Sequence, residues 1–162
     1  MSFITILIFG ILASCFALII ELIVTGLTPV SLIVLETFSF NTVLIVLALA
    51  LIEEITKYVF LHQYALRYLK KVFLTLQQIL FYSLSFGIGF SLLEGVLSWQ
   101  NGIPLTLFSL VSRALLHSST SFLFAYFLFR PITHLSWVSV IRFIGIASLI
   151  HFTYNILTIM VF

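Results

Sequence analysis

The stretch Leu51-Ile52-Glu53-Glu54-Ile55-Thr56-Lys57-Tyr58-Val59-Phe60 places two carboxylates and one ammonium group inside a long apolar run. Glu53 and Lys57 are four residues apart and Glu54 and Lys57 are three apart, so on a helix each pair shares one face. Such charges could mark the boundary between membrane and water. Apolar residues continue on both sides, however, and this favours a position inside the span. Ionisable groups there are costly and usually functional.

The composition is that of an integral membrane protein. Of the 162 residues, 62% are hydrophobic and only 7% are charged, whereas about 25% charged residues are usual in soluble domains. The net charge of +2 is too small to indicate nucleic-acid binding. The single cysteine, Cys15, excludes an internal disulfide framework and a four-cysteine metal site.

Apolar runs separated by turn signals predict an all-α fold, a bundle of about five transmembrane helices forming a single domain over residues 1–162. Each of these runs is long enough to cross a hydrocarbon core, which needs about 20 residues. The predicted spans are about 3–24, 41–62, 72–99, 105–129 and 137–162. A shorter apolar run within residues 30–40 cannot cross, so it is predicted to be an interfacial or re-entrant segment or a loop.

Basic residues predict a multi-pass orientation in the cell membrane. The loops at 63–71 and 130–136 carry four Lys or Arg residues between them, whereas the loops at 25–40 and 100–104 carry none. By the positive-inside rule the first two loops are cytoplasmic, which puts the N-terminus in the cytoplasm and the C-terminus outside. The first span lacks the basic segment that precedes a signal sequence, so we expect a membrane helix with Glu21 at its interfacial end.

Polar side chains from several predicted spans fall at similar depths. Counting about 1.5 Å per residue from the non-cytoplasmic end of each span puts Glu53 and His117 about 18 Å deep and His151 about 15 Å deep. A shallower polar layer on the same side contains Glu94, Arg113 and Asn155. The sequence therefore predicts that Glu53, His117 and His151 meet in one layer, although they come from three different helices.

Helical spacing also predicts which residues face the interior. Arg113 and His117 are four residues apart, as are His151 and Asn155, so each pair projects from one side of its helix. The third span has a stripe of small residues with one carboxylate, which is typical of close helix packing. The stripe consists of Ser83, Gly87, Ser91, Glu94, Gly95 and Ser98. Glu94 and Arg113 could form a structural ion pair or face a substrate, and both interpretations stay open.

Several known protease chemistries do not fit. The His-Glu-x-x-His motif of zincin-like metalloproteases does not occur, and a chain without aspartate cannot be a paired-aspartate protease. The run Ser118–Ser121 lacks a Gly-x-Ser-x-Gly context, so its hydroxyls are expected to pack between helices. His62 and His134 lie near loop edges and are expected to be structural.

Two histidines and a glutamate at one depth fit the activation of a water molecule. A glutamate with a histidine beside it can take a proton from water, and a second histidine with an asparagine can donate hydrogen bonds to a tetrahedral oxyanion. The same side chains could hold Zn²⁺ with an open fourth position. Because they can also act without a metal, we predict no cofactor and leave zinc as the open alternative.

Four motifs, taken in order, resemble the PrsW family of membrane proteases, which is related to the type II CAAX prenyl proteases and the bacteriocin-immunity CPBP proteins. They are Glu53-Glu54-x-x-Lys57, Phe86-Gly-Ile-Gly-Phe90-Ser-Leu-Leu-Glu94, His117 and His151-x-x-x-Asn155, and they cover residues 53–155. The resemblance implies a glutamic-type intramembrane endopeptidase. It makes Glu53, with Glu54 beside it, the catalytic base paired with His117, and it makes His151 and Asn155 the oxyanion site. Supporting roles would fall to Lys57, Glu94 and Arg113.

The predicted function is therefore cleavage of a membrane-bound protein or peptide substrate within the lipid bilayer, with no nucleic-acid partner. Two other functions stay open: a non-catalytic scaffold or immunity-type protein that keeps the polar cluster for packing, and a small ion-coupled transporter using Glu53 and Glu94. A transporter would usually show repeats with broken helices at corresponding positions. Only the Gly87-Ile88-Gly89 step hints at a weakened helix.

Overall fold

The computed structural model describes residues 3–27, 39–69, 74–100, 106–129 and 136–161, and these residues form helices and no strand. The predicted all-α fold is confirmed for this part of the chain. The helices are α1 (Phe3–Leu27), α2 (Phe40–Tyr64), the π-helical turn η2 (Ala65–Leu69), α3 (Leu76–Gln100), α4 (Leu107–Phe129) and α5 (Trp137–Val161).

Four of the helices begin directly after a serine or threonine that caps them. The hydroxyl of each residue accepts a hydrogen bond of 3.0–3.3 Å from the backbone N–H three positions later. These residues are Ser39, Thr75, Thr106 and Ser136. In α3 the side chain of Gln78 also accepts from the backbone N–H of Thr75, which completes a capping box. The caps explain where the helices start, because they satisfy N–H groups that have no partner in the first turn.

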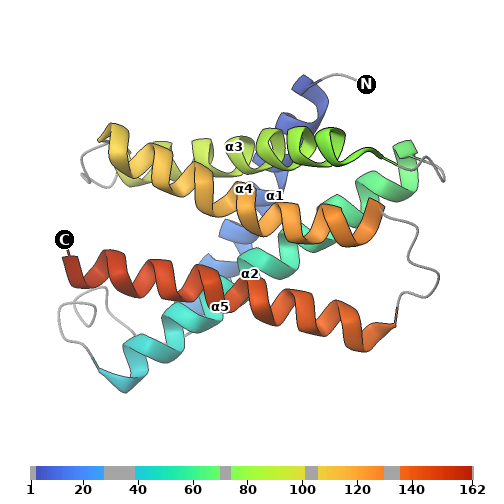
Figure 1. The fold of residues 1–162 in the computed structure, drawn as a ribbon. Coiled ribbons are helices and arrows are strands. Elements are labelled where there is room, and N and C mark those ends of the chain that lie inside the picture. The colour runs from blue at the N-terminus through green and yellow to red at the C-terminus, as the bar shows by residue number, and fades with distance from the viewer. Residues whose placement is uncertain (1–2, 28–38, 70–73, 101–105, 130–135, 162) are drawn as a thin grey trace.

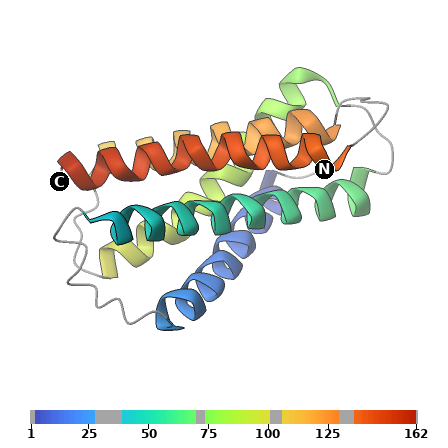
Figure 2. The ribbon, with the colours of Figure 1, turned by 90° about the horizontal axis from the view of Figure 1, so that it is seen from below.

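The helices form two antiparallel pairs joined by α1. Figure 1 shows α3 and α4 side by side, with α1 crossing behind them. Figure 2 shows the second pair, α2 and α5. The first helix packs on both α3 and α2, and α4 also reaches α2 and α5. All five helices therefore contribute to one interior, and the polar residues of α2 lie where the two pairs meet.

Three of the helices, α1, α3 and α5, are long and apolar enough to cross a membrane over Phe3–Gly26, Leu76–Gln100 and Trp137–Ile159. Helix α2 differs because any stretch of it long enough to cross contains Glu53, Glu54 and Lys57. Helix α4 contains a run of polar residues in its middle. The outer surface carries many exposed large apolar side chains, such as Leu22, Leu115 and Leu149. These features indicate a membrane protein.

Small residues let α1, α3 and α4 approach closely. A side chain on Gly89 would collide with the carbonyl oxygen of Leu7 in α1, and one on Gly87 would collide with Ser118 in α4. In the same contact between α1 and α3, a side chain on Gly10 of α1 would collide with the carbonyl oxygen of Phe86 in α3. Helix α3 is therefore held between two neighbours, which is the close packing that its stripe of small residues predicts.

Some predicted features lie outside the described residues. The short segment predicted within 30–40 falls almost entirely in residues 28–38. His134 also lies outside the described residues. So do most of the basic loop residues on which the predicted orientation depends, namely Lys70, Lys71 and Arg130. The second helix also differs from its predicted end near 62, because it reaches Tyr64 and continues through η2.

We expect Gly10→Ala to destabilise the protein by about 1–3 kcal/mol, because the added methyl group meets backbone that cannot rotate away. Thermal unfolding in detergent micelles measures this. The matched control is Gly145→Ala in α5, where nothing lies within 4 Å of the added carbon. It should leave the unfolding temperature unchanged or slightly raised. Equal losses in both variants would contradict close packing between α1 and α3.

Candidate functional site

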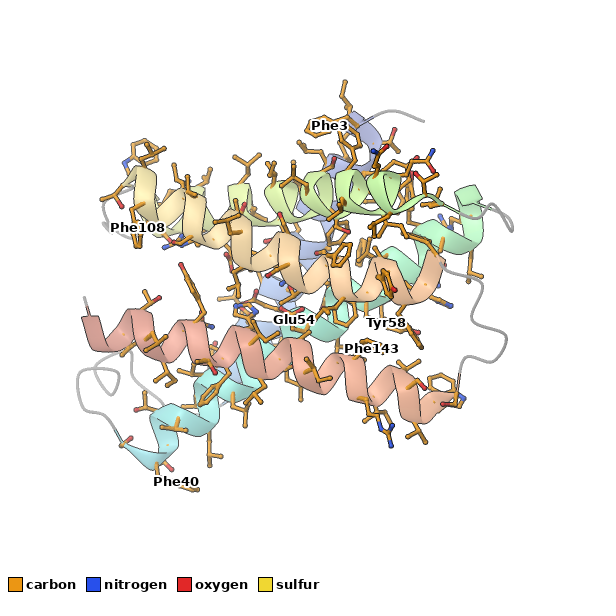
Figure 3. All side chains as sticks on the ribbon, viewed as in Figure 1. Phe3, Phe40, Glu54, Tyr58, Phe108 and Phe143 are labelled. Atoms are coloured by element: carbon orange, nitrogen blue, oxygen red, sulfur yellow. The ribbon has the colours of Figure 1, made fainter. Side chains whose placement is uncertain are left out.

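A buried ion pair holds the charged residues of α2. Lys57 Nζ lies 2.6 Å from Glu54 Oε1, and both side chains are fully buried. The same ammonium group donates a 3.2 Å hydrogen bond to Thr120 Oγ1 in α4 and lies 4.7 Å from the ring centroid of Phe90 in α3. Lys57 is thus the counter-charge of Glu54, and it connects three helices. Figure 3 shows Glu54 in the middle of the bundle.

His151 is oriented by Glu54. Its Nδ1 lies 2.8 Å from Glu54 Oε1, the oxygen that also accepts from Lys57. A carboxylate only accepts, so the shared proton belongs on Nδ1 and the other ring nitrogen, Nε2, is free to accept. This Nε2 lies 3.7 Å from Glu53 Oε2. That distance is too long for a direct hydrogen bond and fits groups that hold a third atom between them.

His117 is held in the same way by a different carboxylate. Its Nε2 lies 2.6 Å from Glu94 Oε2 in α3. Its other nitrogen, Nδ1, is buried without a hydrogen-bond partner among the described residues. The ring of Phe90 covers one side of the imidazole at 4.7 Å, and the ring of His151 lies 5.2 Å away, edge to face. Each histidine therefore uses one nitrogen for a carboxylate and makes no hydrogen bond through the other to any residue that the structure describes.

Glu53, His117 and His151 converge on one small space. Each residue offers one atom that could bind a metal ion, a ring nitrogen or a carboxylate oxygen, and these three atoms lie within 4.8 Å of one another. Glu53 Oε2 is buried and has no hydrogen-bond partner among the described residues. A water molecule would satisfy these atoms, since buried polar groups are rarely left without a partner. A divalent metal ion would also fit two histidines and a carboxylate, with the carboxylates of Glu54 and Glu94 orienting the rings.

A cavity of about 280 Å³ opens beside the Glu53–His117–His151 cluster. Its polar lining comes from α3, α4 and α5 and includes both histidines, Glu94, Ser98, Arg113, Tyr154, Asn155 and Thr158. Its apolar lining comes from Leu18, Leu97 and Leu116. The hydroxyl of Tyr154 is held by Ser112 at 2.9 Å. The cluster therefore borders a space that can admit a small group or a short piece of chain.

The structure brings together the three residues that the sequence predicts to share a layer, and it places Asn155 in the adjoining cavity. It does not separate Glu94 into a shallower layer, because the Glu94 side chain reaches His117. The possible ion pair between Glu94 and Arg113 is not formed. Arg113 instead donates to Ser98 Oγ at 2.6 Å and to the backbone carbonyl of Glu94 at 3.4 Å.

Glu21 is the residue near the site that the sequence reasoning missed. It was expected at the interface, but its Oε1 is buried without a hydrogen-bond partner in the described ranges. It lies three residues, about one helical turn, after Leu18, which lines the cavity. Helix α1 continues to Leu27, three residues beyond the predicted end. Glu21 therefore sits about 4.5 Å further from the helix end than expected.

The remaining candidates are structural in the described part of the chain. His62 stacks on Tyr58 with ring centroids 5.8 Å apart. Ser119 donates to the carbonyl of Leu116, and Thr120 accepts from Lys57. Ser118 and Ser121 are buried hydroxyls between helices. None of these contacts provides a base for a serine nucleophile.

Comparisons of the chain with models of protein families, with curated proteins and with solved structures find no match.

We expect Lys57→Met to destabilise the protein by about 3–5 kcal/mol, because it leaves the Glu54 carboxylate buried without its cation. The double variant Glu54→Gln/Lys57→Met should recover much of that loss, since no net charge is then buried. Thermal unfolding of both variants in the same detergent measures the difference. A double variant that is less stable than Lys57→Met would contradict the assignment of Lys57 as the counter-charge.

Proposed function

We propose that the chain is a five-span intramembrane endopeptidase that uses Glu53 to activate water and cleaves a peptide bond of a membrane-bound protein. The observation that carries the proposal is the convergence of Glu53, His117 and His151 within 4.8 Å, next to a cavity. The order of its motifs, which resembles the PrsW family, adds to this. All five helices would cross the bilayer, with α2 and α4 shielded by the more apolar α1, α3 and α5.

In the proposed reaction a water molecule sits between Glu53 and the free nitrogens of the two histidines. Glu53 takes a proton as the water oxygen bonds to the peptide carbonyl carbon. His117, fixed by Glu94, orients the water. The proton is then passed to the leaving nitrogen as the carbon–nitrogen bond breaks.

His151 and Asn155 face the developing oxyanion. Glu53 first passes the proton that it takes from water to Nε2 of His151, which lies 3.7 Å away. The resulting imidazolium, stabilised by the carboxylate of Glu54 on its far nitrogen, donates to the oxyanion and then gives this proton to the leaving nitrogen. Asn155 lies one helical turn from His151 and lines the cavity. Its amide can provide a second donor once the substrate carbonyl enters. Glu54 and Lys57 thus position His151 and do not touch the substrate.

We expect Glu53→Gln and His117→Ala each to lower the rate of peptide cleavage by about 10²–10⁴-fold, the usual contribution of a positioned acid or base. The assay uses purified protein in lipid nanodiscs with single-span candidate substrates, and the products are identified by mass spectrometry. The matched control is Ser119→Ala, an exposed change two residues from His117 on the same helix. Cleavage that survives both Glu53→Gln and His117→Ala would contradict the assignment of these two residues to the catalytic site.

A zinc-dependent form of the same hydrolase is the second candidate, because two histidine nitrogens and a carboxylate oxygen lie at distances that a metal could draw together. The proposed mechanism predicts that dialysis against a chelator leaves the cleavage rate unchanged. If dialysis abolished cleavage and added Zn²⁺ restored it, Glu53 would be a metal ligand and the base would be another group. The zinc content of the purified protein, measured by mass spectrometry, distinguishes the metal-free mechanism from the zinc-dependent one independently of activity.

A further inference from the structure

Arg113 is a cation at the cavity that no carboxylate neutralises within the described residues. Its guanidinium uses a serine hydroxyl and a backbone carbonyl as acceptors. The nearby carboxylate of Glu94 is committed to His117 at 2.6 Å. Two of the five N–H donors of an arginine are thus accounted for, and both acceptors are neutral.

An arginine in this position needs an anion. Charged side chains inside a membrane bundle usually pair with one another or mark the path of a ligand. Here the guanidinium lines a cavity of about 280 Å³ whose other walls include the neutral side chains of Asn155, Thr158 and Leu97. The planar fork of arginine matches a carboxylate in a bidentate arrangement. The cavity therefore has a cationic wall, and the one acid that lines it among the described residues, Glu94, is hydrogen-bonded to His117 and not to Arg113.

We propose that Arg113 is a specificity residue that binds a carboxylate of the substrate. The inference rests on the proposed peptidase function and deepens it. Arg113 lies four residues, about 6 Å along the helix axis, from His117. An extended peptide rises about 3.3 Å per residue. The carboxylate therefore lies within about two residues of the bond that is cleaved, as an acidic side chain or as the end of the chain.

The size of the cavity favours a short piece of peptide. It lies just below the range of roughly 300–1,000 Å³ that is usual for sites of drug-sized ligands. Its apolar lining suits a small aliphatic side chain beside the carboxylate. A substrate that offers a carboxamide in place of the carboxylate would leave the guanidinium without its partner, and such a mismatch is strongly disfavoured.

Binding is tested without turnover on Glu53→Gln protein in nanodiscs of neutral lipid. The probes are three acetylated dipeptides: leucyl-glutamate amide, leucyl-glutamine amide and leucyl-glutamine with a free C-terminus. We expect one or both acids to bind at least tenfold more tightly than the amide, and to lose that preference when Arg113→Gln is added. The acid that binds identifies the source of the carboxylate. Equal binding of all three would overturn the proposal.

Selectivity in cleavage is tested with a mixed peptide library read by mass spectrometry. Wild type should favour acidic residues or a free C-terminus within two positions of the cut, by tenfold or more, and Arg113→Glu should favour basic residues there. Arg142→Glu, the same change at an exposed arginine of α5, is the control and should keep the wild-type preference. Cleavage without any acidic preference would overturn the role of Arg113 and leave the peptidase standing. Binding of the acids without any peptide cleavage would support the role of Arg113 and overturn the proposed peptidase function.

Two further outcomes would also overturn the proposal. Glu36 is the one glutamate outside the described residues. If Arg113→Gln and Glu36→Gln lower thermal stability by amounts that do not add in the double variant, Arg113 belongs to a structural ion pair. If anionic lipid stabilises wild type but not Arg113→Gln, while the peptide acids do neither, the anion is a lipid headgroup.

Discussion

The shared oxygen of Glu54 is the constraint on which the arrangement depends. Glu54 Oε1 accepts from Lys57 on its own helix and from His151 on α5. Lys57 in turn reaches Thr120 on α4. Two opposite charges buried together cost far less than either alone, and the hydrogen bonds fix their geometry. This network aims Nε2 of His151 at Glu53, whose Oε2 has no hydrogen-bond partner in the part of the chain that the structure describes.

Helix α3 supplies the second half of the site through close packing. Its glycines let the backbone approach α1 on one side and α4 on the other. That approach brings Glu94 onto His117 and lays the ring of Phe90 against both His117 and Lys57. Phe90 therefore contacts both polar networks, His117 of one and Lys57 of the other. The small residues of α3 thus matter for the position of the polar groups as much as for the stability of the bundle.

The sequence was informative where the regular rise of a helix determines which residues lie at the same depth. Helical rise placed Glu53, His117 and His151 at one depth, and the structure brings their side chains together. It failed where side-chain reach or a helix end decides. The contact of Glu94 with His117 was not predicted, because a glutamate side chain can span a helical turn. The end of α1 was predicted three residues too early. The choice of Ser98 over Glu94 by Arg113 depends on rotamers, which spacing does not encode.

Both histidines are anchored by a carboxylate on one nitrogen, so the space between them and Glu53 is lined by acceptors. Such a space attracts a molecule that carries hydrogens and repels an anion. In a peptidase of the proposed kind this asymmetry acts after the chemistry. Cleavage creates a new carboxylate next to Glu53, and two like charges at short range in a water-poor interior repel strongly. The site would thus repel the acid half of its own product, which speeds the release of that product without any moving part.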